Sequence, residues 1–155
     1  MAKISLREKY GPYFAQLAKL SKAAGKIDDT NVYQPENPAT RKIMDNLVGE
    51  NMAPGSRLEG KENFQAFYDA VKSGKHGLIL MEHYSNTDLP ALCWLLEHDG
   101  GKDGPDFQKR IVAIAGMKLN EADPMVKAFA ESFTRVVIYP TRSLDKAEAT
   151  AQTEE

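Results

Sequence analysis

The chain has 155 residues, 42% of them hydrophobic and 27% charged, and its 20 Lys and Arg against 22 Asp and Glu give a formal net charge of −2. This is the composition of a folded globular protein, which excludes a wholly disordered or collagen-like chain, and the lack of a basic excess argues against nucleic acid as a partner. A single cysteine, Cys93, excludes an internal disulfide and a zinc site built from cysteines.

The first half of the chain shows the spacing of amphipathic helices. Apolar residues at helical intervals predict three helices, over about residues 13–20, 40–48 and 64–71. The polar stretches between them, 27–38 and 52–60, contain proline or Pro-Gly and are expected to be loops. We therefore expect residues 1–73 to form a helical N-terminal subdomain.

Beyond residue 73 the pattern changes to short apolar runs that alternate with helical segments. The runs at 77–81, 110–115 and 135–139 predict three buried strands. Helices are expected at 88–97 and 124–132, and a Gly- and Asp-rich loop at 98–105. Strands that alternate with helices imply right-handed crossovers and a parallel sheet, so the predicted fold class is α/β, with residues 74–155 as the α/β domain.

Three strands make a thin sheet with exposed edges, and residues 144–155 resemble the start of a helix without a stop signal. We therefore expect the α/β domain to be incomplete and the chain to be a fragment that continues beyond Glu155.

The motif that carries chemistry is His83-x-x-x-x-Asp88, at the predicted junction of a strand and a helix. In open α/β sheets ligands bind at such junctions, outside the carboxyl ends of the strands. An Asp in the first helical turn is stabilised by the helix dipole. If it accepts a hydrogen bond from one imidazole nitrogen, the other nitrogen is free to act as a general base towards an external hydroxyl.

The spacing alone is weakly specific, because His98 and Asp103 repeat it within a stretch expected to be a solvent-exposed loop. From the residues alone, His83 is equally a catalytic base or a histidine that caps the helix. Cys93 is expected in the helix core, and Ser85 and Thr87 are expected to cap the helix start, with substrate contact as the alternative.

The stretch EHYSNTDLP at 82–90 resembles the Asn-His-x-x-x-x-Asp-Pro block of the glycerolipid acyltransferases, most closely the soluble plastid-type glycerol-3-phosphate acyltransferases. The similarity continues through AIAGMK at 113–118, ADPMVKAF at 122–129 and VVIY at 136–139, and covers about residues 75–144. The helical N-terminal half is also what such enzymes carry.

This resemblance implies a reaction and a set of site residues. His83 would deprotonate the 1-hydroxyl of glycerol-3-phosphate, Asp88 would orient the imidazole, and the alkoxide would attack an acyl thioester on acyl carrier protein or coenzyme A. Arg142, with Ser143 and Lys118, would bind the substrate. No metal or redox cofactor is implied.

The location implied is a soluble compartment such as the cytoplasm or the plastid stroma, with peripheral membrane contact as a further partner. The sequence agrees, since no apolar stretch approaches the ~20 residues of a membrane span and residues 1–10 lack the apolar core of a signal peptide.

The chain departs from the family pattern at three places. Glu82 stands where the family often has Asn, Arg142 is the one clear cation where the family tends to carry a basic pair, and no later arginine-rich block is found. Three alternatives stay open: a lysophospholipid acyltransferase, a hydrolase that uses His83 to activate water, and a non-catalytic module that binds acyl carriers. For Arg142 and Lys118 the alternative is an ordinary solvated side chain.

Overall fold

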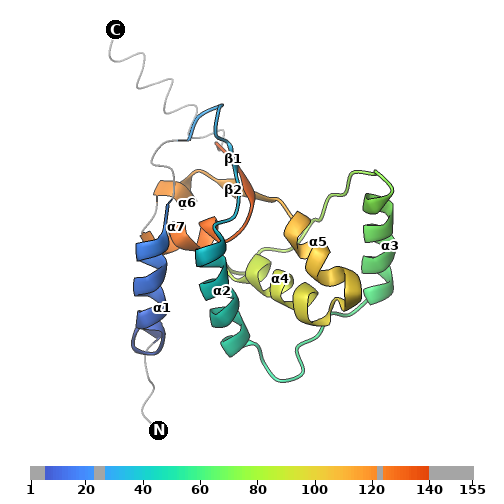
Figure 1. Cartoon of the computed structure of the whole chain (residues 1–155), viewed down its shortest axis with the longest axis horizontal. Coiled ribbons are helices and arrows are strands. Elements are labelled where there is room, and N and C mark those ends of the chain that lie inside the picture. The colour runs from blue at the N-terminus through green and yellow to red at the C-terminus, as the bar shows by residue number, and fades with distance from the viewer. Residues whose placement is uncertain (1–5, 23–26, 122–123, 140–155) are drawn as a thin grey trace. The chain divides into compact units, whose positions relative to one another are not determined.

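The computed structural model describes residues 6–22, 27–121 and 124–139. The described residues divide into two compact units (Figure 1). The first unit combines the described residues up to Met44 and those from Val112 onwards, and the second is the continuous segment 45–111. The boundary that the sequence predicts after residue 73 therefore falls inside the second unit. Helix α2 (Pro38–Asn51) belongs to the first unit up to Met44 and to the second from Asp45 onwards.

The first unit contains a small mixed sheet in the order β1-β3-β2. Strands β2 (Ala113–Gly116) and β3 (Arg135–Ile138) are parallel, as the alternation of strands and helices along the chain predicts. Ile114 lies opposite Val136. The third member, β1 (Tyr33–Gln34), pairs antiparallel with β3 and comes from a stretch expected to be a loop. A strand of two residues in a polar segment is too short to show the alternation of apolar and polar residues by which a strand is predicted. The fold is therefore a mixture of helices and strands, but this sheet is not wholly parallel.

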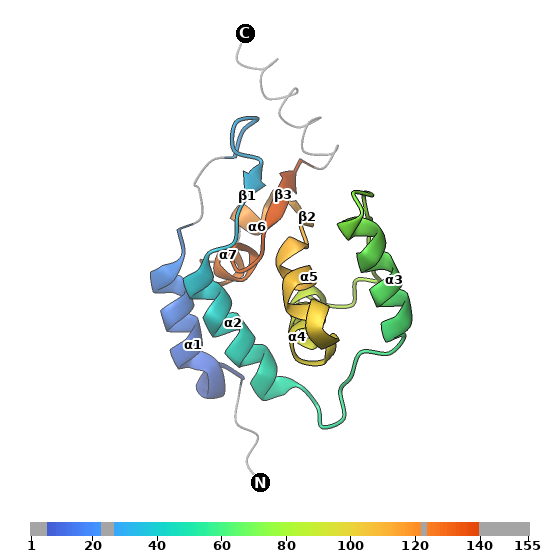
Figure 2. The same cartoon turned by 45° about the vertical axis from the view of Figure 1, so that its right-hand side comes forward.

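Three helices complete the first unit, together with the start of α2 (Figure 2). They are α1 (Leu6–Leu20), α6 (Lys118–Glu121) and α7 (Pro124–Glu131). Helix α1 begins earlier than the start predicted at about residue 13, and Pro12 lies inside it. Leu17 packs with Ile43 and Ala128 in a buried cluster that holds α1 against α7 and α2.

The second unit is helical. It consists of the end of α2, α3 (Lys61–Lys72), α4 (Asp88–Asp99), a single 3₁₀ turn at Gly101–Asp103 and α5 (Gly104–Arg110). Helices α3 and α4 lie where the sequence predicts them. The buried cluster of Tyr68, Leu96 and Phe107 joins α3, α4 and α5, and the rings of Tyr68 and Phe107 meet edge to face at 5.0 Å between centroids.

The end of α4, the 3₁₀ turn and the start of α5 take the place of the loop predicted at 98–105, and α5 also includes the first residue of the strand predicted at 110–115. A side chain at Gly104 would collide with the carbonyl oxygen of Leu96. The glycine that reads as a loop signal thus lets α5 approach α4 closely.

The prediction of a strand at 77–81 is wrong. Residues 75–83 belong to no helix or strand, and the side chains of this run are exposed, Leu78 to 70% and Leu80 to 87%. An apolar run indicates a buried strand only where a neighbouring strand pairs with it, and no strand of the described residues does so.

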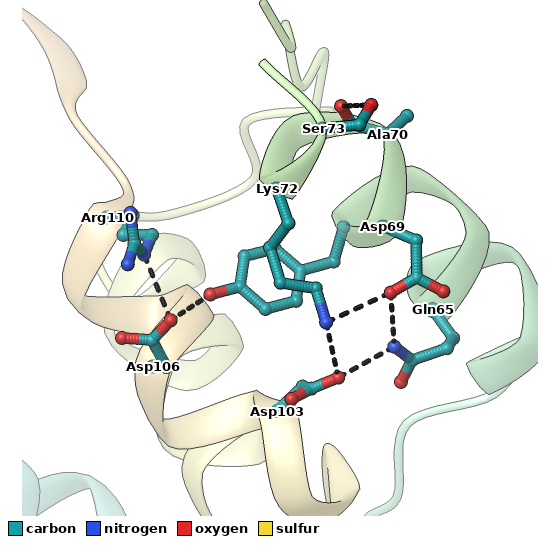
Figure 3. Close-up of polar contacts among 9 residues, drawn as sticks. Gln65, Asp69, Ala70, Lys72, Ser73, Asp103, Asp106 and Arg110 are labelled. Atoms are coloured by element: carbon teal, nitrogen blue, oxygen red, sulfur yellow. Dashed lines mark hydrogen bonds and ion pairs between the residues drawn. The ribbon is translucent and has the colours of Figure 1, made fainter. Parts of the chain in front are cut away.

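A polar network fastens α3 to the turn before α5 and to α5 itself (Figure 3). Lys72 Nζ lies 3.0 Å from Asp103 Oδ2, and Gln65 donates to the same oxygen at 2.7 Å. The buried Tyr68 donates its hydroxyl to Asp106, whose carboxylate also accepts from Arg110 Nε at 3.0 Å. These bonds lower the pKa of the Asp106 and Asp103 carboxyls. Both lowered pKa values are thus accounted for by contacts that hold the helices together.

In the part of the chain that the structure describes, no helix is both long enough and apolar enough to cross a membrane.

Candidate functional site

The structure brings His83 and Asp88 together. Asp88 is the first residue of α4, and His83 lies in the segment that leads into it. His83 Nδ1 is 3.1 Å from Asp88 Oδ2. The side chain of His83 is 74% exposed and that of Asp88 is 18% exposed. The ring is thus open to solvent, while the carboxylate that contacts it is largely covered.

Asp88 is anchored by the backbone that precedes it. Its Oδ2 accepts from Tyr84 N at 2.7 Å and Ser85 N at 2.8 Å, in addition to the contact with His83. Its Oδ1 accepts from Ser85 Oγ at 3.0 Å. Tyr84 and Ser85 precede α4 and belong to no helix or strand, so their amides need another acceptor, and the Asp88 carboxylate supplies it.

These hydrogen bonds hold the pKa of the Asp88 carboxyl below its ordinary value, the backbone amide of Ser85 being the largest cause. Partial desolvation acts in the opposite direction but is outweighed. Asp88 is therefore ionised at neutral pH. An ionised carboxylate only accepts hydrogen bonds, so a neutral His83 that bonds to it carries its proton on Nδ1. Nε2 then holds a lone pair, which is the state a general base requires.

Glu82, the departure from the Asn of the resembling family, contacts Tyr84. The Tyr84 hydroxyl donates to the Glu82 carboxylate, and this bond raises the pKa of the phenol. Both side chains are exposed.

The remaining predicted site residues are Lys118, Arg142 and Ser143. Lys118 is the exposed first residue of α6 and belongs to the first unit, whereas His83 and Asp88 belong to the second. Arg142 and Ser143 lie outside the described residues.

His98 and Asp103, the second pair with this spacing, each contact other residues. His98 lies in the last turn of α4 rather than in a loop, its ring stacks on Trp94 at 4.1 Å, and its Nδ1 lies 2.8 Å from the Trp94 carbonyl oxygen. Asp103 contacts Gln65 and Lys72. The same spacing thus brings the two side chains together at His83 and Asp88 but not at His98 and Asp103.

Sequence reasoning missed the role of the segment between the two site residues. It assigned Ser85 and Thr87 to the helix start, whereas the structure shows Ser85 holding Asp88 through both its amide and its hydroxyl. The signal was a Ser three residues before an Asp that opens an apolar helix.

The chemistry that this arrangement supports is removal of a proton from an external hydroxyl group or from water. Among residues 6–22, 27–121 and 124–139, no group of three or more His, Cys, Asp or Glu side chains is placed to hold a metal ion. Cys93 is buried in α4 and its thiol is not exposed for reaction. Comparisons with protein-family models, curated proteins and solved structures gave no match to this chain.

Proposed function

We propose that the protein is an O-acyltransferase of the glycerol-3-phosphate type. It would move an acyl group from acyl carrier protein or coenzyme A to the 1-hydroxyl of glycerol-3-phosphate, in phospholipid synthesis. The observation that carries the proposal is the 3.1 Å contact between His83 Nδ1 and Asp88 Oδ2, within the motif that resembles the glycerolipid acyltransferases. Exposure of the imidazole supports it, because a general base must be reachable by the acceptor alcohol.

The reaction proceeds without a protein nucleophile. His83 Nε2 takes the proton of the 1-hydroxyl as that oxygen attacks the thioester carbonyl carbon. The tetrahedral intermediate then collapses, the C–S bond breaks, and the imidazolium returns the proton to the departing thiolate. Asp88 stays ionised throughout and stabilises the imidazolium, as the carboxylate does in a Ser-His-Asp triad.

The remaining parts of the proposal rest on the resemblance. Arg142, Ser143 and Lys118 would bind the phosphate of the acceptor, since cationic and hydroxyl side chains suit that group. The thioester is a co-substrate, and no metal or redox cofactor is required. The reaction would take place in the cytoplasm or a stroma-like compartment, with contact to the membrane surface where the product is used.

The test is release of free thiol from an acyl thioester in the presence of glycerol-3-phosphate. We expect His83→Ala to lower the rate by about 10²- to 10⁴-fold, the usual contribution of a general base. His98→Ala is the matched control, since it also removes an exposed histidine that stands five residues before an Asp, and it should retain activity. Equal rates for the unmodified protein and His83→Ala would contradict the proposal.

The same assay separates the alternatives. Thiol release that needs His83 but not glycerol-3-phosphate would identify a hydrolase. Release that needs a lysophospholipid as acceptor would identify a lysophospholipid acyltransferase. Binding of acyl carrier protein without thiol release would identify a non-catalytic module.

A further inference from the structure

The hydroxyl of Ser85 has a complete and directional set of hydrogen bonds. It donates to Asp88 Oδ1 at 3.0 Å and accepts from Thr87 N at 3.1 Å. Thr87 Oγ1 lies 2.7 Å from it. A serine hydroxyl has one proton and two lone pairs. Because the ionised Asp88 carboxylate can only accept, the single Ser85 proton points to it, and the Thr87 hydroxyl then donates to Ser85 as Thr87 N does.

Ser85 also reaches the other oxygen of the same carboxylate, because its amide donates to Asp88 Oδ2 at 2.8 Å. One residue therefore holds both oxygens of Asp88, and this restrains rotation of the carboxylate about its terminal torsion, which is otherwise soft. The oxygen that faces His83 Nδ1 is kept in place by that restraint.

We propose that Ser85 is a positioning residue, which acts through Asp88 to hold the imidazole of His83 in the tautomer with the proton on Nδ1. The importance of this role for turnover rests on the acyltransferase function proposed above. The positioning itself is a property of the folded chain and is measurable without substrate.

Loss of the hydroxyl has a defined consequence. In Ser85→Ala, Asp88 Oδ1 loses its side-chain donor while Oδ2 keeps its two amide donors. Rotation of the carboxylate is then opposed only by the bonds at Oδ2, so its contact with the imidazole is less firmly fixed. The pKa of Asp88 rises towards its ordinary value, since the Ser85 hydroxyl is among the groups that lower it.

The experiment uses nitrogen NMR to measure the tautomer ratio of the His83 ring and carbon NMR to follow the titration of the Asp88 carboxyl, both in the full chain. The tautomer ratio is measured at a pH high enough for the imidazole to be neutral. We expect Nδ1–H to predominate in the unmodified protein and Nε2–H, the form favoured by free histidine, to increase in Ser85→Ala. Ser85→Thr keeps a hydroxyl and should restore the original ratio. Ser73→Ala is the matched control, because it removes a hydroxyl that only donates to the Ala70 carbonyl at the end of α3.

In the thiol-release assay, Ser85→Ala should lower kcat by about tenfold, the size expected for one hydrogen bond to a charged group, and leave KM nearly unchanged. An unchanged tautomer ratio and unchanged Asp88 titration in folded Ser85→Ala would overturn the proposal. If Ser85→Ala does not fold, Ser85→Cys takes its place, because its thiol is only a weak donor. The tautomer ratio must then shift towards Nε2–H in Ser85→Cys, and an unchanged ratio in that variant would equally overturn the proposal. A tautomer change in a protein that releases no thiol would support the positioning and reject the acyltransferase function.

Discussion

Asp88 connects the stability of the fold to the proposed chemistry at the scale of a single residue. Its folded-state pKa lies below the ordinary value for Asp, so the folded state binds a proton less readily than the unfolded state. The stabilisation is therefore fully present above the ordinary pKa, about 3.9, and is lost as the pH falls through the lower folded-state pKa.

Asp88→Asn should remove this contribution. We expect the variant to have a smaller free energy of unfolding than the unmodified protein at pH 7, and the difference to shrink as the pH falls below about 4. Urea unfolding at a series of pH values measures it. Other carboxyls with lowered pKa, such as Asp99 and Asp103, destabilise both proteins in acid, so the difference between the two isolates Asp88. A difference independent of pH would show that the carboxylate is not specifically stabilised.

Asp88 also shows which features of the site a sequence pattern can predict and which it cannot. The spacing of His83 and Asp88, with an amphipathic helix beginning at the Asp, allowed their contact to be anticipated. The hydrogen bonds that make Asp88 a fixed partner come from the backbone of Tyr84 and from Ser85. Backbone amides have no signature in side-chain identity, so the anchoring required the structure.

At the scale of elements, periodicity succeeded where one face of a helix is covered. Helices α3, α4 and α7 place apolar residues at intervals of three and four, and each lies where it was predicted. Periodicity failed where the type of secondary structure depends on which other element the segment packs against. Gly104 looks like loop sequence but permits close helix packing, and the run at 77–81 looks like a buried strand but is exposed.

Two leucines of the second unit test this description of the run at 77–81. Leu80 is 87% exposed, whereas Leu96 is 2% exposed in the cluster with Tyr68 and Phe107. Leu96→Ala should lower the free energy of unfolding by about 2–5 kcal/mol, because it leaves a cavity. Leu80→Ala should change it by less than about 0.5 kcal/mol, since it removes no buried contact. Chemical denaturation of both variants measures the contrast, and a cost of several kcal/mol for Leu80→Ala would mean that this run is buried as a strand.

At the scale of the whole molecule, each unit has apolar clusters of its own. Leu17, Ile43 and Ala128 lie together in the first unit, whereas the cluster around Tyr68 lies in the second. The first unit also links distant parts of the chain, since Glu131 accepts from Lys22 N at 2.9 Å. Parts of a protein with separate cores open with separate free energies, which amide hydrogen exchange resolves.

Leu17→Ala should therefore weaken the two units unequally. Leu17 is fully buried, and its truncation should cost about 2–5 kcal/mol. Hydrogen-exchange mass spectrometry should show faster exchange in α1, α7 and β3, with α3 and α5 affected much less. Leu20→Ala in the same helix is the control, because Leu20 is partly exposed and its loss should change exchange little. An equal acceleration across both units would show that the chain unfolds as one cooperative body, in which case the His83–Asp88 pair would depend on the whole fold rather than on the second unit.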